Sequence, residues 1–118
     1  MKRIITIAAI SNIMMIITLS GYAQDSKYVT TTFHVDGVCG SCKVRIENAA
    51  SIKGVKTCDW NIGTGLFTVI YDSTKVDLMK IHKSIAAVGH STDKIPADPD
   101  AYNKLPKCCK YNDGVQKH

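Results

Sequence analysis

Residues 37–47 read Gly-Val-Cys-Gly-Ser-Cys-Lys-Val-Arg-Ile-Glu, and within them Cys39 and Cys42 form a Cys-x-x-Cys pair. Asp36-Gly37 ends the strand predicted before the pair, and Ser41 can cap a helix that begins near Cys42. Two thiols at this spacing can hold one soft metal ion or can cycle through a disulfide. The pair therefore predicts either a metal site or a redox centre at the start of a helix.

Regular elements are predicted on both sides of the pair. Alternating residues predict a strand over Tyr28–Val35. The helix that begins near Cys42 is expected to run to about Ile52, because Lys53-Gly54 provides a helix stop.

Four more elements follow Gly54. Strands over Val55–Ile62 and Leu66–Tyr71 are predicted to form a hairpin. A helix over Val76–Val88 is predicted from an amphipathic stripe. The stripe consists of Leu78, Ile81, Ile85 and Val88. A short last strand is predicted over Ser91–Ile95.

The predicted order is strand, helix, strand, strand, helix, strand, which is typical of an α+β, ferredoxin-like βαββαβ sandwich. In that fold, two helices cover one face of a four-stranded antiparallel sheet. After Pro96 the sequence has two more prolines, many polar residues and little periodicity, so residues 97–118 are predicted to form an extended C-terminal tail. The folded domain is expected to span residues 24–96.

The first 23 residues have the pattern of an export signal. Met1-Lys2-Arg3 is a short positive start, residues 4–19 are mostly apolar, and Gly21-Tyr22-Ala23 matches the small-residue motif before a signal-peptidase cut. Because the apolar run is shorter than the ~20 residues of a membrane-spanning helix, cleavage after Ala23 is preferred to a retained anchor. We expect an exported, periplasmic protein without stable membrane insertion after cleavage.

Charge and cysteine content narrow the function classes. The formal net charge is +5, and removal of Lys2 and Arg3 with the signal peptide would leave +3. The lysines are scattered, without a basic stripe interleaved with aromatic residues, so nucleic-acid binding is not expected. The chain has five cysteines, an odd number, so at least one must stay free or bind something other than a cysteine of the same chain.

A series of short motifs supports a more specific interpretation. The Cys-x-x-Cys pair is followed by Ile46-Glu47, Gly54-Val55, Trp60-Asn61-Ile62, Tyr71-Asp72 and Gly89-His90. With these motifs the chain resembles the heavy-metal-associated (HMA) domain family, which includes copper chaperones, the metal-binding modules of copper-exporting ATPases and periplasmic mercury-binding proteins. The expected export matches the periplasmic members. Two features differ: the Met of the family's Gly-Met-x-Cys motif is absent, and the interval from Gly37 to Cys39 is one residue shorter.

The resemblance implies that Cys39 and Cys42 bind a heavy-metal ion for transfer or sequestration, without catalysis. Copper(I) is the expected ion and mercury(II) the alternative, because both are soft and prefer thiolate sulfur. The start of the helix is expected to lower the pKa of the thiols and favour the thiolate. A membrane metal transporter or another acceptor protein is the implied partner.

Two other roles of the pair stay open. A thiol-disulfide oxidoreductase of the thioredoxin type needs more strands and a cis-proline facing the thiols, whereas here a hairpin directly follows the first helix and no proline precedes Pro96. A structural disulfide between Cys39 and Cys42 would close a very short loop and add little stability. The oxidoreductase is kept as the alternative function of a different class.

Three further residues are candidate ligands. His90 follows the second predicted helix, in a loop that lies beside the metal loop in the HMA fold, and can offer an imidazole. Cys108 and Cys109 lie in the tail, and the residues before them could extend up to ~35 Å and return to the pair. A site of three or four sulfurs could also hold zinc(II). A separate second site and a disulfide with another cysteine are the alternatives, and Cys58 is expected to be a core residue.

Overall fold

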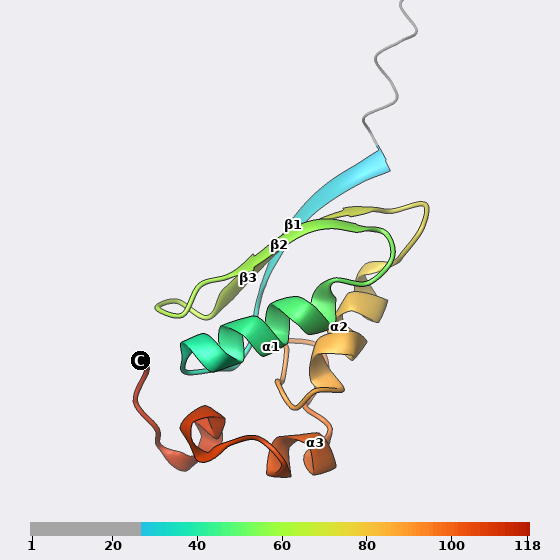
Figure 1. The fold of residues 1–118 in the computed structure, drawn as a ribbon. Helices are drawn as coiled ribbons and strands as arrows, with labels where there is room; N and C mark the ends of the chain where they lie inside the picture. Colours follow the sequence, from blue (N-terminus) through green and yellow to red (C-terminus); the bar gives the residue numbers. More distant parts are fainter. Residues whose placement is uncertain (1–26) are drawn as a thin grey trace, which may run out of the picture.

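The computed structural model describes residues 27–118 (Figure 1). The predicted signal peptide and the cut after Ala23 lie outside the described residues. No helix within residues 27–118 combines the length and the apolar content that crossing a membrane requires.

Three strands form the sheet. They are β1 (Tyr28–His34), β2 (Val55–Trp60) and β3 (Leu66–Asp72), and they lie in the antiparallel order β1-β3-β2. Side chains alternate across each strand, and Phe67 and Val69 of the central strand are buried. The hairpin predicted between β2 and β3 is confirmed.

Two helices cover one face of the sheet (Figure 1). They are α1 (Gly40–Ala50) and α2 (Leu78–Ala86), both within the predicted ranges apart from the first residues of α1. Ile46 of α1 and Ile81 of α2 are fully buried, because the apolar stripe of each helix faces the sheet. The α+β class and the helix positions of the ferredoxin-like prediction are thereby confirmed.

The predicted fourth strand, Ser91–Ile95, is not confirmed. Within residues 27–118 it is represented by one isolated bridge, between Val35 and Thr92. Thr92 Oγ1 accepts hydrogen bonds from the N–H groups of Lys94 and Ile95 at 3.2 and 3.0 Å. This side-chain acceptor folds the segment into a turn and so competes with the extended conformation of a strand.

The tail is not extended as predicted but contains short helices. These are α3 (Pro99–Asn103) and the 3-10 helices η2 (Lys107–Cys109) and η3 (Tyr111–Asp113). Asp98 caps α3 by accepting a hydrogen bond from the Ala101 N–H, so Asp98-Pro99 is a helix start rather than a break. Figure 1 shows the tail, in orange and red, running below α1 toward the N-terminal end of that helix.

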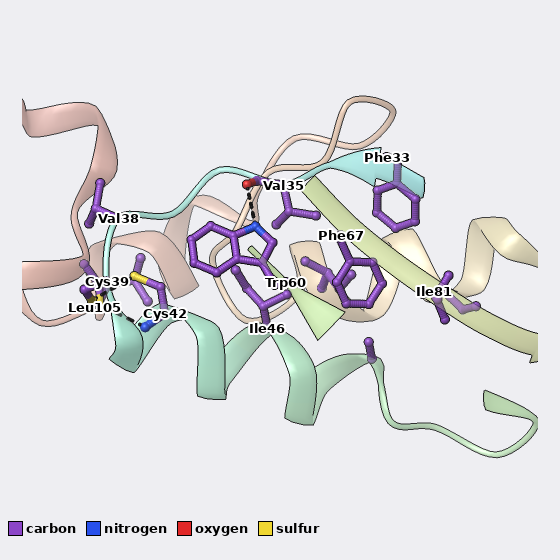
Figure 2. Close-up of a cluster of buried hydrophobic side chains, with 14 of the residues drawn as sticks. Phe33, Val35, Val38, Cys39, Cys42, Ile46, Trp60, Phe67, Ile81 and Leu105 are labelled. Carbon is purple, nitrogen blue, oxygen red and sulfur yellow. Dashed lines mark hydrogen bonds between the residues drawn. The ribbon is translucent and has the colours of Figure 1, made fainter. Parts of the chain in front are cut away.

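The hydrophobic core reaches the loop that carries the cysteine pair. Trp60 is fully buried, and its Nε1–H donates to Val35 O at 3.0 Å and to Gly65 O at 3.1 Å. Figure 2 shows Trp60 between Ile46 and the loop that leads to Cys39 and Cys42. The buried core therefore supports the loop that carries Cys39 and Cys42.

Candidate metal site

Three cysteine sulfurs converge at the N-terminal end of α1. Cys39 is the N-cap residue of α1, Cys42 lies in the first turn, and Cys109 lies in η2. Cys39 Sγ lies 3.3 Å from Cys42 Sγ and 3.2 Å from Cys109 Sγ. All three sulfurs lie within 4.8 Å of one another, and all three residues are buried. All five cysteines of the chain are free thiols.

The local sequence explains how the pair is presented. The Cys39 backbone is extended, and its Sγ accepts a hydrogen bond from the Cys42 N–H at 3.4 Å. Cys39 therefore takes the capping position that was predicted for Ser41, and the helix begins at Gly40, earlier than expected. Because Cys42, the third residue of the helix, donates its N–H to this sulfur, its side chain lies beside Cys39.

The tail is attached on both sides of Cys109. Before it, Leu105 is buried in the same hydrophobic cluster as Cys39, and both are labelled in Figure 2. After it, Tyr111 Oη donates a hydrogen bond to Gly89 O at 2.7 Å, and the His118 N–H donates to Val38 O at 2.7 Å. These contacts hold η2 over the Cys-x-x-Cys loop.

The thiols differ in proton affinity. Burial raises the pKa of Cys42 to about 12, so at this residue burial outweighs the predicted effect of the helix start. Burial alone would also raise the pKa of Cys109, but hydrogen bonds from Cys42, Arg45 and Cys39 lower it to about 6. Arg45 Nη1 donates to Cys109 Sγ at 3.4 Å. Cys109 is therefore a thiolate at neutral pH, held beside a guanidinium and two thiols.

Cys108 lies at the exposed edge of the three buried sulfurs. Its side chain is exposed, and its Sγ lies 3.9 Å from Cys109 Sγ. It belongs to a second group of potential ligands, together with Cys39 and His118, in which one atom from each residue lies within 4.8 Å of the others.

His90 belongs to neither group. It is fully buried, its Nδ1 lies 2.7 Å from Asp36 O, and its ring stacks on Tyr111 with 5.5 Å between ring centroids. Burial lowers the pKa of His90. The structure places this residue under the tail, and its role as an additional ligand stays a prediction.

Cys58 also belongs to neither group. It is half-buried on β2, where its Sγ donates to Glu47 O at 3.7 Å.

Two residues of the site were not predicted. Arg45 follows Cys42 by three positions, so one helical turn of spacing could have indicated that both lie on the same face. For His118 the sequence offers no pattern.

Comparison with known proteins identifies the family. The sequence model of the heavy-metal-associated domain matches residues 32–91, and the chain belongs to this family. Cys39 and Cys42 lie inside the matched residues, whereas Cys108, Cys109 and His118 lie beyond them. No curated protein matches the chain.

Solved structures of similar fold are known. The CopZ metallochaperone is 32% identical with a TM-score of 0.53, over 54% of this chain and 98% of that one. Oxidized MerP from Ralstonia metallidurans CH34 is 26% identical with a TM-score of 0.53, over 56% and 94%. The water-soluble region of the P-type ATPase CopA from Bacillus subtilis is 27% identical with a TM-score of 0.52, over 55% and 44%.

Proposed function

We propose that this protein binds a soft heavy-metal ion, copper(I) before others, through Cys39, Cys42 and Cys109, and holds it for transfer or sequestration. The observation that carries the proposal is the convergence of three buried sulfurs at the start of α1. Three sulfurs at ~2.3 Å from one metal ion lie about 4 Å apart in a trigonal arrangement. The sulfur pairs at 3.2 and 3.3 Å therefore need to open by less than ~1 Å.

The donor set favours particular ions. Thiolates in low number suit copper(I) and mercury(II), which are soft, so mercury(II) is the nearest alternative cargo. Zinc(II) is a third option, because three thiolates and a further donor can surround it. The similarity to a metallochaperone supports metal handling, and the similarity to the water-soluble region of a P-type ATPase supports a membrane transporter as a partner.

The chain's own residues divide the work of binding. Cys109 is already a thiolate at neutral pH, whereas Cys42, with its raised pKa, must release a proton when the ion binds. Arg45 stays beside Cys109 and offsets part of the negative charge of the thiolates. Transfer of the ion exchanges one metal–sulfur bond for another and changes no covalent bond of a substrate. We therefore propose a carrier rather than an enzyme.

Export belongs to the proposal. Residues 1–23 are proposed to be a signal peptide cut after Ala23, residues 24–96 the HMA domain and residues 97–118 a cysteine-containing tail that completes the site. The protein would then act in the periplasm. Determination of the N-terminal residue of protein recovered from the periplasmic fraction tests this: Gln24 is expected, and an intact Met1 would contradict it.

A competition titration tests metal binding. Reduced protein is titrated with copper(I) against a chromogenic chelator, and Cys39→Ser and Cys42→Ser are measured beside the unmodified chain. Both variants are expected to lose tight binding at this three-sulfur site, whereas Cys58→Ser, which changes a cysteine outside both ligand groups, is expected to keep it. Unchanged affinity in both Cys39→Ser and Cys42→Ser would overturn the proposal.

A thiol-disulfide oxidoreductase is the second candidate. The observation in its favour is the Cys109 thiolate 3.2 Å from Cys39 Sγ, since a thiolate at that distance could attack a Cys39–Cys42 disulfide. Turnover of a model disulfide well above the rate of a free thiol would favour this candidate. Tight copper(I) binding without such turnover would favour the metal carrier.

A further inference from the structure

Two groups of potential ligands share one sulfur atom. The inner set is Cys39, Cys42 and Cys109, and the outer set is Cys39, Cys108 and His118. Within each set the ligand atoms lie within 4.8 Å of one another. The inner set is buried, whereas Cys108 and His118 are exposed. Cys39 Sγ therefore lies between a buried and an exposed ligand set.

We propose that the outer set is a second metal site, and that the Cys39 thiolate bridges two soft ions. The inference rests on the proposed function, because the inner ion occupies the site proposed above. A thiolate sulfur has three lone pairs, so it can donate to two soft cations at once. The outer ion would then have two sulfur ligands and one imidazole nitrogen, a donor set that suits copper(I).

The 3-10 helix η2 explains how neighbouring cysteines serve different ions. Cys108 and Cys109 are adjacent, and their Sγ atoms lie 3.9 Å apart. Cys109 is fully buried against Cys39, while Cys108 is exposed. One short turn thus directs Cys108 to the outer set and Cys109 to the inner set.

His118 is held in place by the same loop. Its N–H donates to Val38 O at 2.7 Å, one residue before Cys39. Its ring Nδ1 lies 2.7 Å from Gln116 O. When Nδ1–H donates to that carbonyl, Nε2 keeps its lone pair for a metal ion, which is how metal-binding histidines are usually oriented.

A positively charged side chain lies beside the sulfurs of the inner set. Two copper(I) ions with four thiolates have an excess of negative charge. Arg45, which donates to Cys109 Sγ, offsets part of this charge. The exposed outer ion would be the one in reach of an acceptor protein, with the inner ion as the retained one.

Native mass spectrometry measures the stoichiometry. Reduced protein is titrated with copper(I) without oxygen, in the presence of a chelator that removes loosely bound ions. We expect two ions per chain in the unmodified protein and in Cys58→Ser, and one ion per chain in Cys108→Ser. One ion in the unmodified protein would overturn the second site and leave the proposed function intact, whereas no bound ion would overturn both. Two ions in Cys108→Ser would also overturn the second site.

A histidine variant tests the imidazole ligand. Because Cys39 and Cys108 remain, His118→Ala is expected to weaken binding of the second ion by about tenfold or more without affecting the first. His34→Ala, which removes an exposed histidine on β1, is the matched control and should bind both ions as before. In NMR spectra the His118 ring nitrogens should shift with the second equivalent of copper(I). Shifts that are absent, or complete at the first equivalent, would contradict the assignment of His118.

Discussion

Cys109 is fully buried and still has a pKa of about 6. A buried charge is costly unless hydrogen bonds or an opposite charge compensate it. Here Arg45 supplies the charge, with Nη1 at 3.4 Å, and Cys39 supplies a thiol at 3.2 Å. Arg45 thus connects α1 to the tail at the atom that completes the inner ligand set.

Replacement of Arg45 should raise the pKa of Cys109. In Arg45→Gln the charged donor is lost while burial stays, so the folded protein holds the Cys109 proton to a higher pH. The Cβ chemical shift of Cys109, followed by NMR over a pH series, measures the midpoint, which is expected to move up from about 6. Arg45→Lys keeps the charge and should show a smaller change. An unmoved midpoint in Arg45→Gln would refute the role of Arg45.

Loss of the third sulfur should weaken copper(I) binding without abolishing it. Cys109→Ser leaves Cys39 and Cys42, so we expect the affinity to fall by about tenfold or more, measured by chelator competition. Cys58→Ser is the control for the loss of a thiol. Equal affinities in Cys109→Ser and the unmodified protein would mean that the tail sulfur is not a ligand.

At the scale of elements, the loop between β1 and α1 passes very close to Trp60. A Cβ added to Gly37 would lie 2.8 Å from Cη2 of the Trp60 ring and 3.2 Å from Cβ of Cys42. Gly40, three residues later, has no atom within 4 Å of such a Cβ. Close approach therefore requires the glycine in the loop, Gly37, but not Gly40, the glycine that begins α1.

This contrast predicts opposite effects of two alanine substitutions. Gly37→Ala should reduce the free energy of unfolding by about 1–3 kcal/mol, because the ring and the backbone must shift. Gly40→Ala should change it by less than about 1 kcal/mol, in the stabilising direction, because alanine favours the helix. Urea denaturation of both variants measures the difference, and equal stabilities would contradict the close approach.

Element positions were predictable where hydrophobic periodicity is strong, as in the α2 stripe and the hairpin around Gly63-Thr64-Gly65. The predictions were wrong where a single polar side chain determines the local backbone conformation. The Thr92 hydroxyl favours a turn where a strand was predicted, and Asp98 starts a helix in a segment that was predicted to be extended. Of the site, the Cys39 and Cys42 pair was recognisable, but the conformation of the tail decides which of its two cysteines faces inward.

For the molecule as a whole, a buried histidine makes folding sensitive to acid. His82 is fully buried, stacks on Phe33 with 3.8 Å between ring centroids, and lies 2.7 Å from Thr92 Oγ1 through Nδ1. Burial lowers its pKa below 6.5. The unfolded chain therefore binds a proton as the pH falls through 6.5, while the folded chain does not.

The free energy of unfolding should consequently decrease below about pH 6.5, with a contribution from His82 of at most about 1.4 kcal/mol per pH unit. Above that pH both states are neutral at His82 and this contribution is constant. Urea denaturation over a pH series measures the slope. His82→Phe, which keeps an aromatic ring against Phe33, should show a shallower slope, and an identical slope would contradict the assignment.

The contact between Cys39 and Cys109 joins residues that are 70 positions apart. Closing so long a segment costs more chain entropy than forming α1, which brings Cys39 and Cys42 together locally. The two-thiol loop should therefore assemble early in folding, and the third sulfur should arrive only when the tail docks. The order of folding would then separate a first, looser capture of an ion by two thiols from its retention by three.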